Sequence, residues 1–229
     1  HVSRQMMVPK KADCNLKTSD GVIELTGFAG DQKFKTSDAD IAVENVNGEF
    51  SGKTSDGNIT ALNINGPTSL VTSDGDIKAS KIHGEASFKT SDGKITANEI
   101  VGNVSAVTSD GNIVMENIDG THNARTSDGN IDFEGLSGGL TAQTSDGDIH
   151  GNFEHLHKKL YLKTSDGNIS VGVPAGLGMD VKLKGEDIHT RLRDFSGNTG
   201  DHSVEGTISG GGVEVELITS DGDIDLNYN

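Results

Sequence analysis

Residues 54–71 read TSDGNITALNINGPTSLV, and units of this kind recur along most of the chain. The tripeptide Thr-Ser-Asp that opens the unit occurs ten times, and the first eight copies begin 18 residues apart. A fixed period of this length is typical of a solenoid in which each repeat forms one coil. The copies begin at Thr18, Thr36, Thr54, Thr72, Thr90, Thr108, Thr126, Thr144, Thr164 and Thr219.

Within one coil, apolar and polar residues alternate on two separate stretches. Counting each Thr as position 1, position 6 is Ile in all ten copies, and positions 8, 11 and 17 are mostly apolar or small. Positions 5, 7, 9, 14, 16 and 18 are mostly polar. Alternation with a period of two predicts half-buried β-strands. Each coil of about 18 residues should hold two main strands, and the stacked coils should form two parallel sheets in a right-handed solenoid.

The whole chain, residues 1–229, is therefore predicted to be one all-β domain, a single parallel β-solenoid (β-helix) capped at both ends. Residues 1–17 should form a first coil with a cap at Met6, Met7 and Val8. Residues 18–172 should form the regular coils, and residues 173–229 irregular C-terminal coils and a second cap. Caps are expected because the ends of a solenoid expose unpaired strand edges.

The Thr-Ser-Asp-Gly segment is interpreted as a corner that needs no ligand. Parity places the Thr at position 1 in the interior, where stacked hydroxyls can bond to one another or to the backbone. Asp at position 3 is expected to accept hydrogen bonds from backbone amides two residues on, and Gly at position 4 to allow a positive φ. Ala39 is the one residue that replaces this Gly.

The column of Asp carboxylates at position 3 leaves a second interpretation open. Like charges about 4.8 Å apart repel each other, and bound calcium would offset that repulsion. Each coil also divides into two halves of nine residues, since Gly at position 4 is matched by Gly at position 13, and nine-residue repeats are typical of calcium-binding solenoids. Calcium, however, takes about six to eight oxygen ligands, and one carboxylate per coil is too few. No metal-binding residue and no cofactor is therefore assigned.

The charge balance limits the partners. The chain has 35 acidic and 19 basic residues, which give a net charge of −16. Such a surface repels nucleic-acid phosphates and anionic membranes. No apolar run has the length of a membrane helix, so direct membrane insertion is not expected. The chain begins at His1 without a signal peptide, and it is interpreted as a trimmed or mature form.

The uniformity of the repeats argues against an enzyme. Some polysaccharide lyases are parallel solenoids, but catalysis needs a local cluster that breaks the repeat. The one irregular coil carries two extra residues, expected within residues 152–155, and its His155 and His157 lack the neighbouring ligands of a zinc site. Cys14, the only cysteine, falls on an inward position and is interpreted as a buried free thiol. No catalytic residue is assigned.

Four segments resemble the Toastrack family of bacterial adhesin-like domains. They are the repeated Ser-Asp-Gly-Asn/Asp-Ile, the Ile-x-Gly half-turn, the Val-Pro-Ala-Gly that begins at Val173, and the closing Gly-Gly-Gly-x-x-x-x-Leu-x-Thr-Ser-Asp-Gly-Asp-Ile. The resemblance covers nearly the whole chain. It implies a single β-solenoid attached to, or exported through, a bacterial envelope. The family has no established catalytic residues, so none is carried over.

We therefore expect a non-catalytic, adhesin-like structural or binding module that is extracellular or part of the bacterial cell envelope. Its partner would be an extracellular or envelope protein or a glycan. A calcium-stabilised scaffold built on the Asp ladder is the alternative, and a carbohydrate-active β-helix enzyme is a further one. The binding residues should lie where the repeat breaks, at residues 152–158 and beyond Val173.

Overall fold

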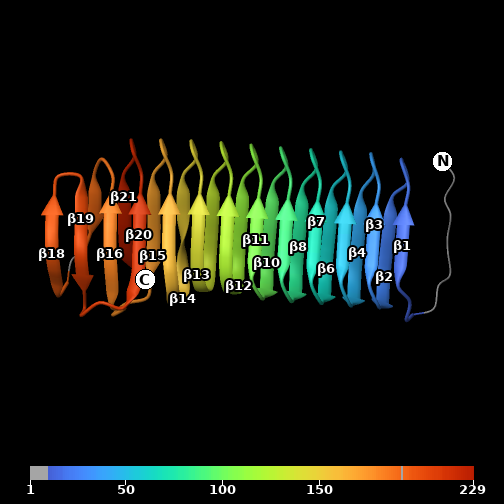
Figure 1. The fold of residues 1–229 in the computed structure, drawn as a ribbon, viewed down its shortest axis with the longest axis horizontal. Coiled ribbons are helices and arrows are strands. Elements are labelled where there is room, and N and C mark those ends of the chain that lie inside the picture. The colour runs from blue at the N-terminus through green and yellow to red at the C-terminus, as the bar shows by residue number, and fades with distance from the viewer. Residues whose placement is uncertain (1–9, 192) are drawn as a thin grey trace.

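The structure is a computed structural model that describes residues 10–191 and 193–229, so the expected cap at Met6, Met7 and Val8 lies outside the described residues. The described chain contains strands and turns but no helix. Its coils stack into one elongated body, with β1 (Cys14–Lys17) near one end and β18 (Phe195–Gly200) at the other (Figure 1). This arrangement confirms the predicted all-β parallel solenoid.

Each of the first five regular coils holds two strands. The longer strands cover positions 6–12 and are β2 (Ile23–Ala29), β4 (Ile41–Asn47), β6 (Ile59–Asn65), β8 (Ile77–His83) and β10 (Ile95–Val101). The shorter strands cover positions 15–18 and are β3 (Gln32–Lys35), β5 (Phe50–Lys53), β7 (Thr68–Val71), β9 (Ala86–Lys89) and β11 (Val104–Val107). In the next three coils the two strands run on as one, in β12 (Ile113–Arg125), β13 (Ile131–Gln143) and β14 (Ile149–Lys163).

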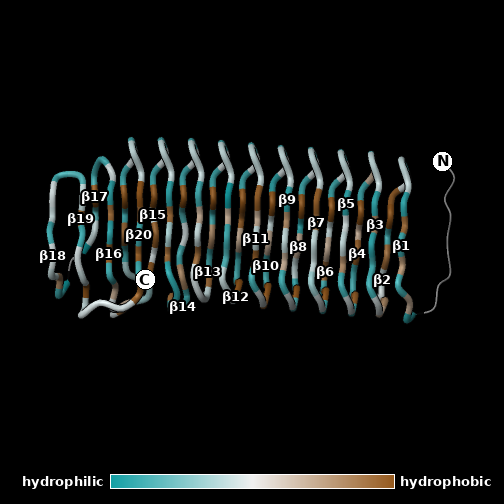
Figure 2. Tube along the Cα trace, in the orientation of Figure 1, coloured by the Kyte–Doolittle hydropathy of each residue, from teal (hydrophilic) through white to brown (hydrophobic). Residues whose placement is uncertain are grey.

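Successive coils pair in parallel with a constant register. Ile59 pairs with Ile41 on one side and with Ile77 on the other, each 18 residues away. The longer and the shorter strands form separate ladders that meet in β12–β14, which belong to both. The inward rows are apolar, and Figure 2 shows hydrophobic segments recurring in the same place in each coil. Ile59, Ile77 and Ile95 are fully buried, as the position-6 pattern predicts.

The Thr at position 1 closes each corner from the inside, as predicted. The Thr72 hydroxyl donates to the carbonyl oxygens of Ser55 and Gly57 in the preceding coil, at 3.0 Å each. It also accepts a hydrogen bond from the amide of Gly75 at 3.3 Å. Because one buried hydroxyl serves three backbone groups in two coils, it links the corner to the stack.

The Gly at position 4 has a different reason from the predicted positive φ. These glycines are absent from the left-handed residues of the described chain. A Cβ on Gly93 would instead overlap the carbonyl group of Gly75, because the two corners lie in direct backbone contact. The positive φ occurs at position 13, for example 154° at Gly66. The prediction was wrong about the cause, since close stacking and not φ excludes a side chain here.

The predicted role of the Asp at position 3 is also wrong. Within the described residues, no backbone amide donates a hydrogen bond to a position-3 carboxylate, and Asp56 and Asp74 are exposed. The Asn or Asp at position 5 bonds the backbone instead. The side-chain oxygen of Asn58 accepts the amide of Asp76 at 2.8 Å, and the carboxylate of Asp76 accepts the amide of Lys94 at 2.8 Å. The polar ladder that connects the corners therefore runs along position 5.

The irregular coil spreads its extra residues more widely than predicted. Leu136 pairs with Phe153 and Ser137 with His155, so Glu154 is one extra residue. The pairing then passes from Leu156 to Leu160 while the neighbouring strand β13 advances by only two residues. These additions are partly offset by one residue fewer before Phe153. The insertion therefore occupies β14 between residues 151 and 160 rather than residues 152–155 alone.

The C-terminal strands do not stack in chain order. They are β15 (Ile169–Val173), β16 (Met179–Lys184), β17 (Ile188–Thr190), β18, β19 (Ser203–Ile208), β20 (Val213–Ile218) and β21 (Ile224–Tyr228). β20 lies between β14 and β16, and β21 lies between β15 and β17. The corner of Thr219 accordingly stacks on the corner of Thr164, and the Thr219 hydroxyl donates to the carbonyl oxygens of Ser165 and Gly167.

Residues 174–212 therefore form an insertion within the last coil, and we call this segment the inserted cap. It leaves the stack after β15, forms the outermost layer, and returns to β20. Its β16 pairs in parallel with β20 and antiparallel with β19, which in turn pairs with β18. The cap thus covers the end of the solenoid with an antiparallel hairpin, seen at the left end of Figure 1.

Candidate binding groove

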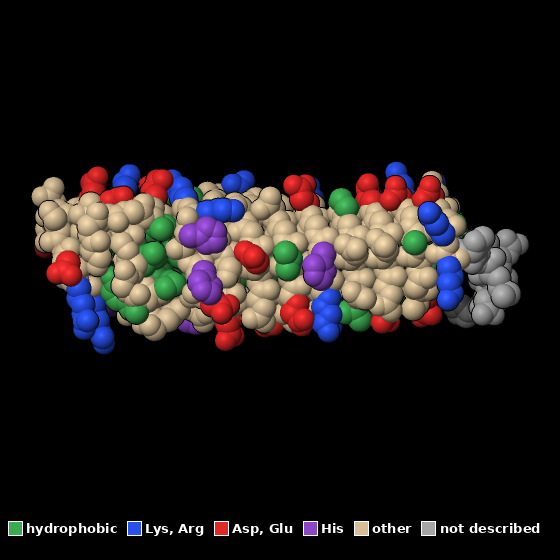
Figure 3. All heavy atoms as spheres, turned by 90° about the horizontal axis from the view of Figure 1, so that it is seen from below, with side chains coloured by type: hydrophobic (Ala, Val, Ile, Leu, Met, Phe, Trp, Pro, Cys, Tyr) green, Lys and Arg blue, Asp and Glu red, His purple; other side chains and the backbone are tan. Residues whose placement is uncertain are grey.

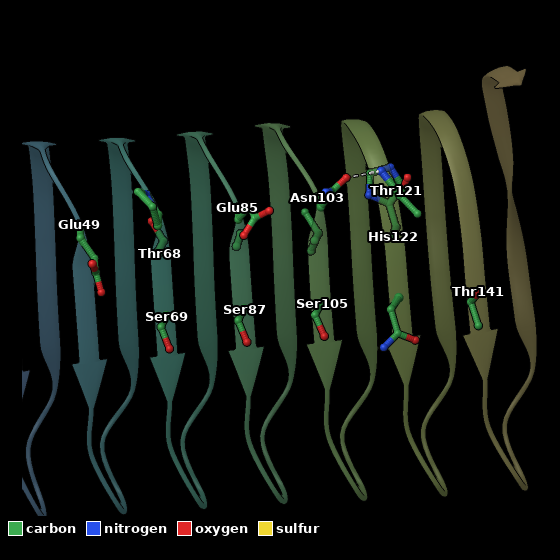
Figure 4. A pocket seen from close by; sticks show the side chains of 14 residues that line it. Glu49, Thr68, Ser69, Glu85, Ser87, Asn103, Ser105, Thr121, His122 and Thr141 are labelled. Carbon is green, nitrogen blue, oxygen red and sulfur yellow. Dashed lines mark hydrogen bonds between the residues drawn. The ribbon is translucent and has the colours of Figure 1, made fainter. Parts of the chain in front are cut away.

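A groove crosses the outer face of the shorter-strand ladder. It encloses about 690 Å³ and extends from Glu49 to Thr141 over six coils. Along its length, position 16 carries only short polar side chains, which we call the serine row. Figure 4 shows several of them projecting from successive strands. The serine row consists of Ser51, Ser69, Ser87, Ser105, Asn123 and Thr141.

The serine row is bounded by long side chains at both ends. In the same register, Lys33 precedes Ser51 and Tyr161 follows Thr141. Five steps of about 4.8 Å make the row about 24 Å long. The strands beneath it are fully paired on both sides, so their backbone groups are already bonded within the ladder. The row can therefore contact a ligand through side chains but cannot accept an added strand.

Two further outward rows run beside the serine row. Position 14 contributes Glu49, Glu85 and Asn103, and Asn103 accepts the amide of Thr121 at 3.0 Å (Figure 4). Position 18, two residues beyond the serine row on the same face, contributes Lys53 and Lys89, both exposed, in register with Val71 between them. Only the position-14 row belongs to the lining of the groove, and its charged members are the carboxylates of Glu49 and Glu85.

A histidine that the sequence reasoning did not single out lies in the core beneath the groove. His122 is 1% exposed, and its Nε2 lies 3.4 Å from the carbonyl oxygen of Ser137. Its Nδ1 has no partner within the described residues. Burial lowers the pKa of His122 below its usual value, although the Ser137 carbonyl opposes this shift. The sequence alone could have indicated that His122 is buried, because the apolar residues Val104 and Leu140 occupy the same position in the adjoining coils.

The residues expected at the break of the repeat do not form a site together. His155 and His157 are exposed on β14, and His155 Nδ1 lies 3.4 Å from the Ser137 hydroxyl. Figure 3 shows histidine side chains on the face turned toward the viewer, some of them next to each other and others further along the body. No group of three or more His, Cys, Asp or Glu side chains with the geometry of a metal site occurs among the described residues. Cys14 is half-buried rather than buried.

The position-3 carboxylates form the Asp ladder, and their mutual influence is seen at its N-terminal end. A hydrogen bond with the neighbouring Asp20 carboxyl raises the pKa of Asp38 above its usual value, and burial and the charge of Asp56 act in the same direction. These carboxylates lie on the corners that follow the upward-pointing strands in Figure 1. They are separate from the groove, so the ladder and the groove are independent features.

Beyond Val173, the second region where a site was expected, a smaller cavity of about 440 Å³ lies between the inserted cap and Tyr228. Arg191, Arg193 and Asp194 line it. Burial raises the pKa of the Tyr228 hydroxyl, with the nearby Arg193 acting against that shift. This cavity is short, whereas the groove continues over six coils.

Comparison with known proteins identifies the family. The Toastrack DUF4097 family model matches residues 71–227, which is more than half of the chain. Neither the curated proteins nor the solved structures contain a match. No helix among the described residues is both long enough and apolar enough to cross a membrane. The stacked coils, the corner motif and the family match agree, and the chain belongs to the Toastrack family.

Proposed function

We propose that this Toastrack domain is a non-catalytic, adhesin-like binding module and that its groove holds an extended ligand, a glycan or a segment of a protein. The observation that supports the proposal is the serine row. Over six coils the outward position 16 carries small polar residues, while Lys33 and Tyr161 bound the row. A continuous floor of hydroxyl and amide groups suits a long polar ligand.

Because the same backbone position recurs in every coil, the sizes of the side chains at position 16 can be compared directly. Position 16 points away from the core, and its side chains are exposed at Ser87 and Asn123 and half-buried elsewhere in the row. The fold tolerates large residues there, as Lys33 and Tyr161 show. Six successive small residues thus leave a hollow that packing does not require. A surface shaped beyond the needs of the fold is a reasonable place to expect binding.

The test places a Tyr in the middle of the serine row, because the fold already accepts Tyr161 at the same position of a neighbouring coil. The variant Ser87→Tyr should keep the wild-type melting temperature and lose most binding in a screen against a glycan array and envelope protein fractions. Thr60→Tyr, on the exposed face of β6 in the other ladder, is the matched control and should bind as the wild type does. Equal binding by Ser87→Tyr and wild type would show that the groove is not the binding site.

The extracellular or envelope location is part of the same proposal, and the family supports it. Fractionation of cells that produce the native protein tests it, with recovery in the cytosol as the contrary result. The calcium-stabilised scaffold has a separate test. It predicts that calcium raises the melting temperature and that a chelator lowers it again. The enzyme alternative predicts turnover in a panel of polysaccharide substrates.

A further inference from the structure

The inserted cap ends in a strand edge at one extremity of the molecule. Among the described residues β18 pairs with β19 alone, and it forms the outermost layer, at the end away from β1 (Figure 1). The six residues of β18 include no charged residue and no Pro, and its pairing with β19 has no bulge. Proteins usually protect an edge with a Lys, a Pro, a bulge or a very short strand. The edge of β18 has none of these features, so another strand can pair with it.

The hydrogen bonds of the cap hairpin show which backbone groups of β18 point toward this edge. The amide of Ser209 donates to the carbonyl oxygen of Asp194 at 3.2 Å, so the even-numbered residues of β18 bond to β19. The two-residue loop that follows β18 agrees, because such a loop is closed by a hydrogen-bonded pair, here Gly200 and Ser203. The odd-numbered residues therefore direct both the amide and the carbonyl group away from β19. They are Phe195, Gly197 and Thr199.

These outward groups are complementary to those of a second copy. When two β18 strands lie antiparallel with Gly197 on a two-fold axis, Gly197 faces Gly197 and Phe195 faces Thr199 of the second copy. The facing residues are then the hydrogen-bonded pairs of an antiparallel ladder, each of which exchanges two backbone hydrogen bonds. An aromatic residue opposite a β-branched one is a favourable cross-strand pair. The Phe195 ring lies over Gly197 and Gly206 on one face of the hairpin, so it leaves the edge itself open.

The charges that flank β18 are also complementary in this arrangement. Arg193 and Asp194 precede the strand, Asp201 follows it, and all three are exposed. With Gly197 on the axis, Arg193 takes the register of Asp201 in the second copy, and Asp194 lies opposite the uncharged Gly200. A register shifted by one residue would set Asp194 opposite Asp201, and like charges in that position repel. The same shift would set the outward backbone groups of one strand against residues already bonded to β19 in the other. Charge and hydrogen bonding thus favour one register.

We propose that the edge of β18 joins two copies of this chain, cap to cap, in a dimer with two-fold symmetry. The strands β16, β19 and β18 of each copy then form one continuous sheet across the axis. A contact along one strand edge is smaller than a standard stable interface, so the dimer forms at high protein concentration. The inference does not depend on the proposed function. With both, one long particle carries two grooves, and binding to a repetitive ligand gains from two contacts at once.

Sedimentation velocity measures the association. The wild-type chain should change from monomer to dimer as its concentration rises to about 1 mM. Thr199→Pro removes an outward amide and places a ring in the edge, and its association constant should fall at least about tenfold. Its unfolding midpoint should stay close to that of the wild type, because Pro is tolerated where the amide of an edge strand faces solvent. The matched control Thr199→Val keeps the amide and the β-branched shape, and it should dimerise as the wild type does.

Cysteine cross-linking tests the register without disturbing the edge. Ser196 of one copy lies opposite Asn198 of the other in a non-hydrogen-bonded pair, where the Cα atoms are about 4.5 Å apart and a disulfide fits. With Cys14→Ser to remove the native thiol, the double variant Ser196→Cys, Asn198→Cys should form a covalent dimer on mild oxidation. In either single variant the two thiols lie on diagonal neighbours about 7–8 Å apart, and cross-linking should be far weaker.

Three results would overturn the proposal. The first is a wild-type chain that sediments as a monomer over the whole concentration range. The second is a dimer that persists in Thr199→Pro and gives no cross-link in the double cysteine variant, because its contact then lies elsewhere. The third is equal cross-linking in the single and double cysteine variants, which indicates random collision. None of these results bears on the groove, because the proposed function is tested by ligand binding to Ser87→Tyr.

Discussion

In the regular coils each residue stacks on the residue 18 places away, whereas in the inserted cap the pairing distance changes from strand to strand. Ile95 meets Ile77 and Ile113, and the same contact recurs in every coil. In the cap, Met179 meets both Ile208 and Val213. The structure of the regular coils is therefore determined by the same backbone contacts repeated in each coil. The structure of the cap depends instead on its own hairpin and on the coil against which it packs.

The largest effect should come from removing the layer that joins the two regions. A chain that ends at Gly212 lacks β20 and β21, which bury Val215, Leu217, Ile224 and Leu226. Burial of these four side chains contributes about 6–12 kcal/mol before opposing terms. Hydrogen exchange should show β16–β19 unprotected, because β16 loses its parallel neighbour β20 and β17 loses β21, which leaves the cap hairpin without the layer on which it rests. Full protection of these strands would contradict the assigned pairing.

The complementary change removes the cap and keeps the layer. Replacing residues 174–213 by Ile-Asn-Gly, the residues at Ile64, Asn65 and Gly66, restores a coil of normal length between Val173 and Glu214. The corner of Thr219 should remain stacked, so β14 and β15 should stay protected in the same exchange experiment. Loss of protection in both strands would show that the cap is needed to hold the last coil.

The next largest effect should come from a methyl group at a corner. Gly93→Ala places a Cβ against the carbonyl of Gly75 and should cost about 3 kcal/mol or more of unfolding free energy, since backbone on both sides must shift. The control in the cap is Gly176→Ala, where φ is 78° but no atom lies within 4 Å of the Cβ. It should cost about 1–2 kcal/mol. Urea denaturation compares the two, and equal losses would exclude close stacking as the cause.

A smaller effect is expected from removing one corner hydroxyl. Thr90→Val keeps the shape of the side chain but leaves the carbonyl of Gly75 and the amide of Gly93 without this partner. The expected loss is about 1–3 kcal/mol, the usual cost of unsatisfied buried polar groups. Thr199→Val in β18, whose hydroxyl is exposed, should change stability by less than about 0.5 kcal/mol. A denaturation midpoint that is unchanged in Thr90→Val would contradict the role of the Thr column.

The smallest expected effect is a change in how the unfolding free energy depends on pH, and it comes from replacing His122. Burial lowers the pKa of His122 in the folded state, so below its ordinary value of 6.5 the unfolded chain binds a proton that the folded chain does not. Stability from this group is complete above pH 6.5 and is lost as the pH falls toward the folded pKa. His122→Leu, which copies Leu140 in the next coil, should flatten this part of the pH profile. His83→Leu, at an exposed position, should leave it unchanged.

The fold of the regular coils could be predicted from the sequence because the residues that determine it recur at fixed positions of the repeat. Ile at position 6 and Thr at position 1 are read directly from the repeat, and both lie inside as expected. The roles of Asp56 and Gly57 could not be read in the same way. Both residues suit an isolated turn, and only the distance to the preceding coil shows that contact with Ala39 excludes a side chain at Gly57.

The groove and the insertion of the cap between β15 and β20 were missed for different physical reasons. The small residues of the serine row are visible in the sequence, but their meaning depends on knowing that position 16 points outward beside long neighbours such as Tyr161. A C-terminal cap was predicted, but its insertion within the last coil was not, because spacing along the chain does not reveal an insertion. The 55 residues from Thr164 to Thr219 suggest extra coils, whereas the structure stacks the two corners directly.

The placement of β20 and β21 also sets an order of events during synthesis. The ribosome produces β16–β19 before the two strands on which they rest, and synthesis proceeds at about 5–20 residues per second. Throughout that interval β14 and β15 present open edges while β16 has no parallel neighbour. The nascent chain must therefore keep β16 from pairing directly with β14, since such a contact would shut out the later strands. Any protein that assists its folding during synthesis meets this vulnerable intermediate rather than the finished stack.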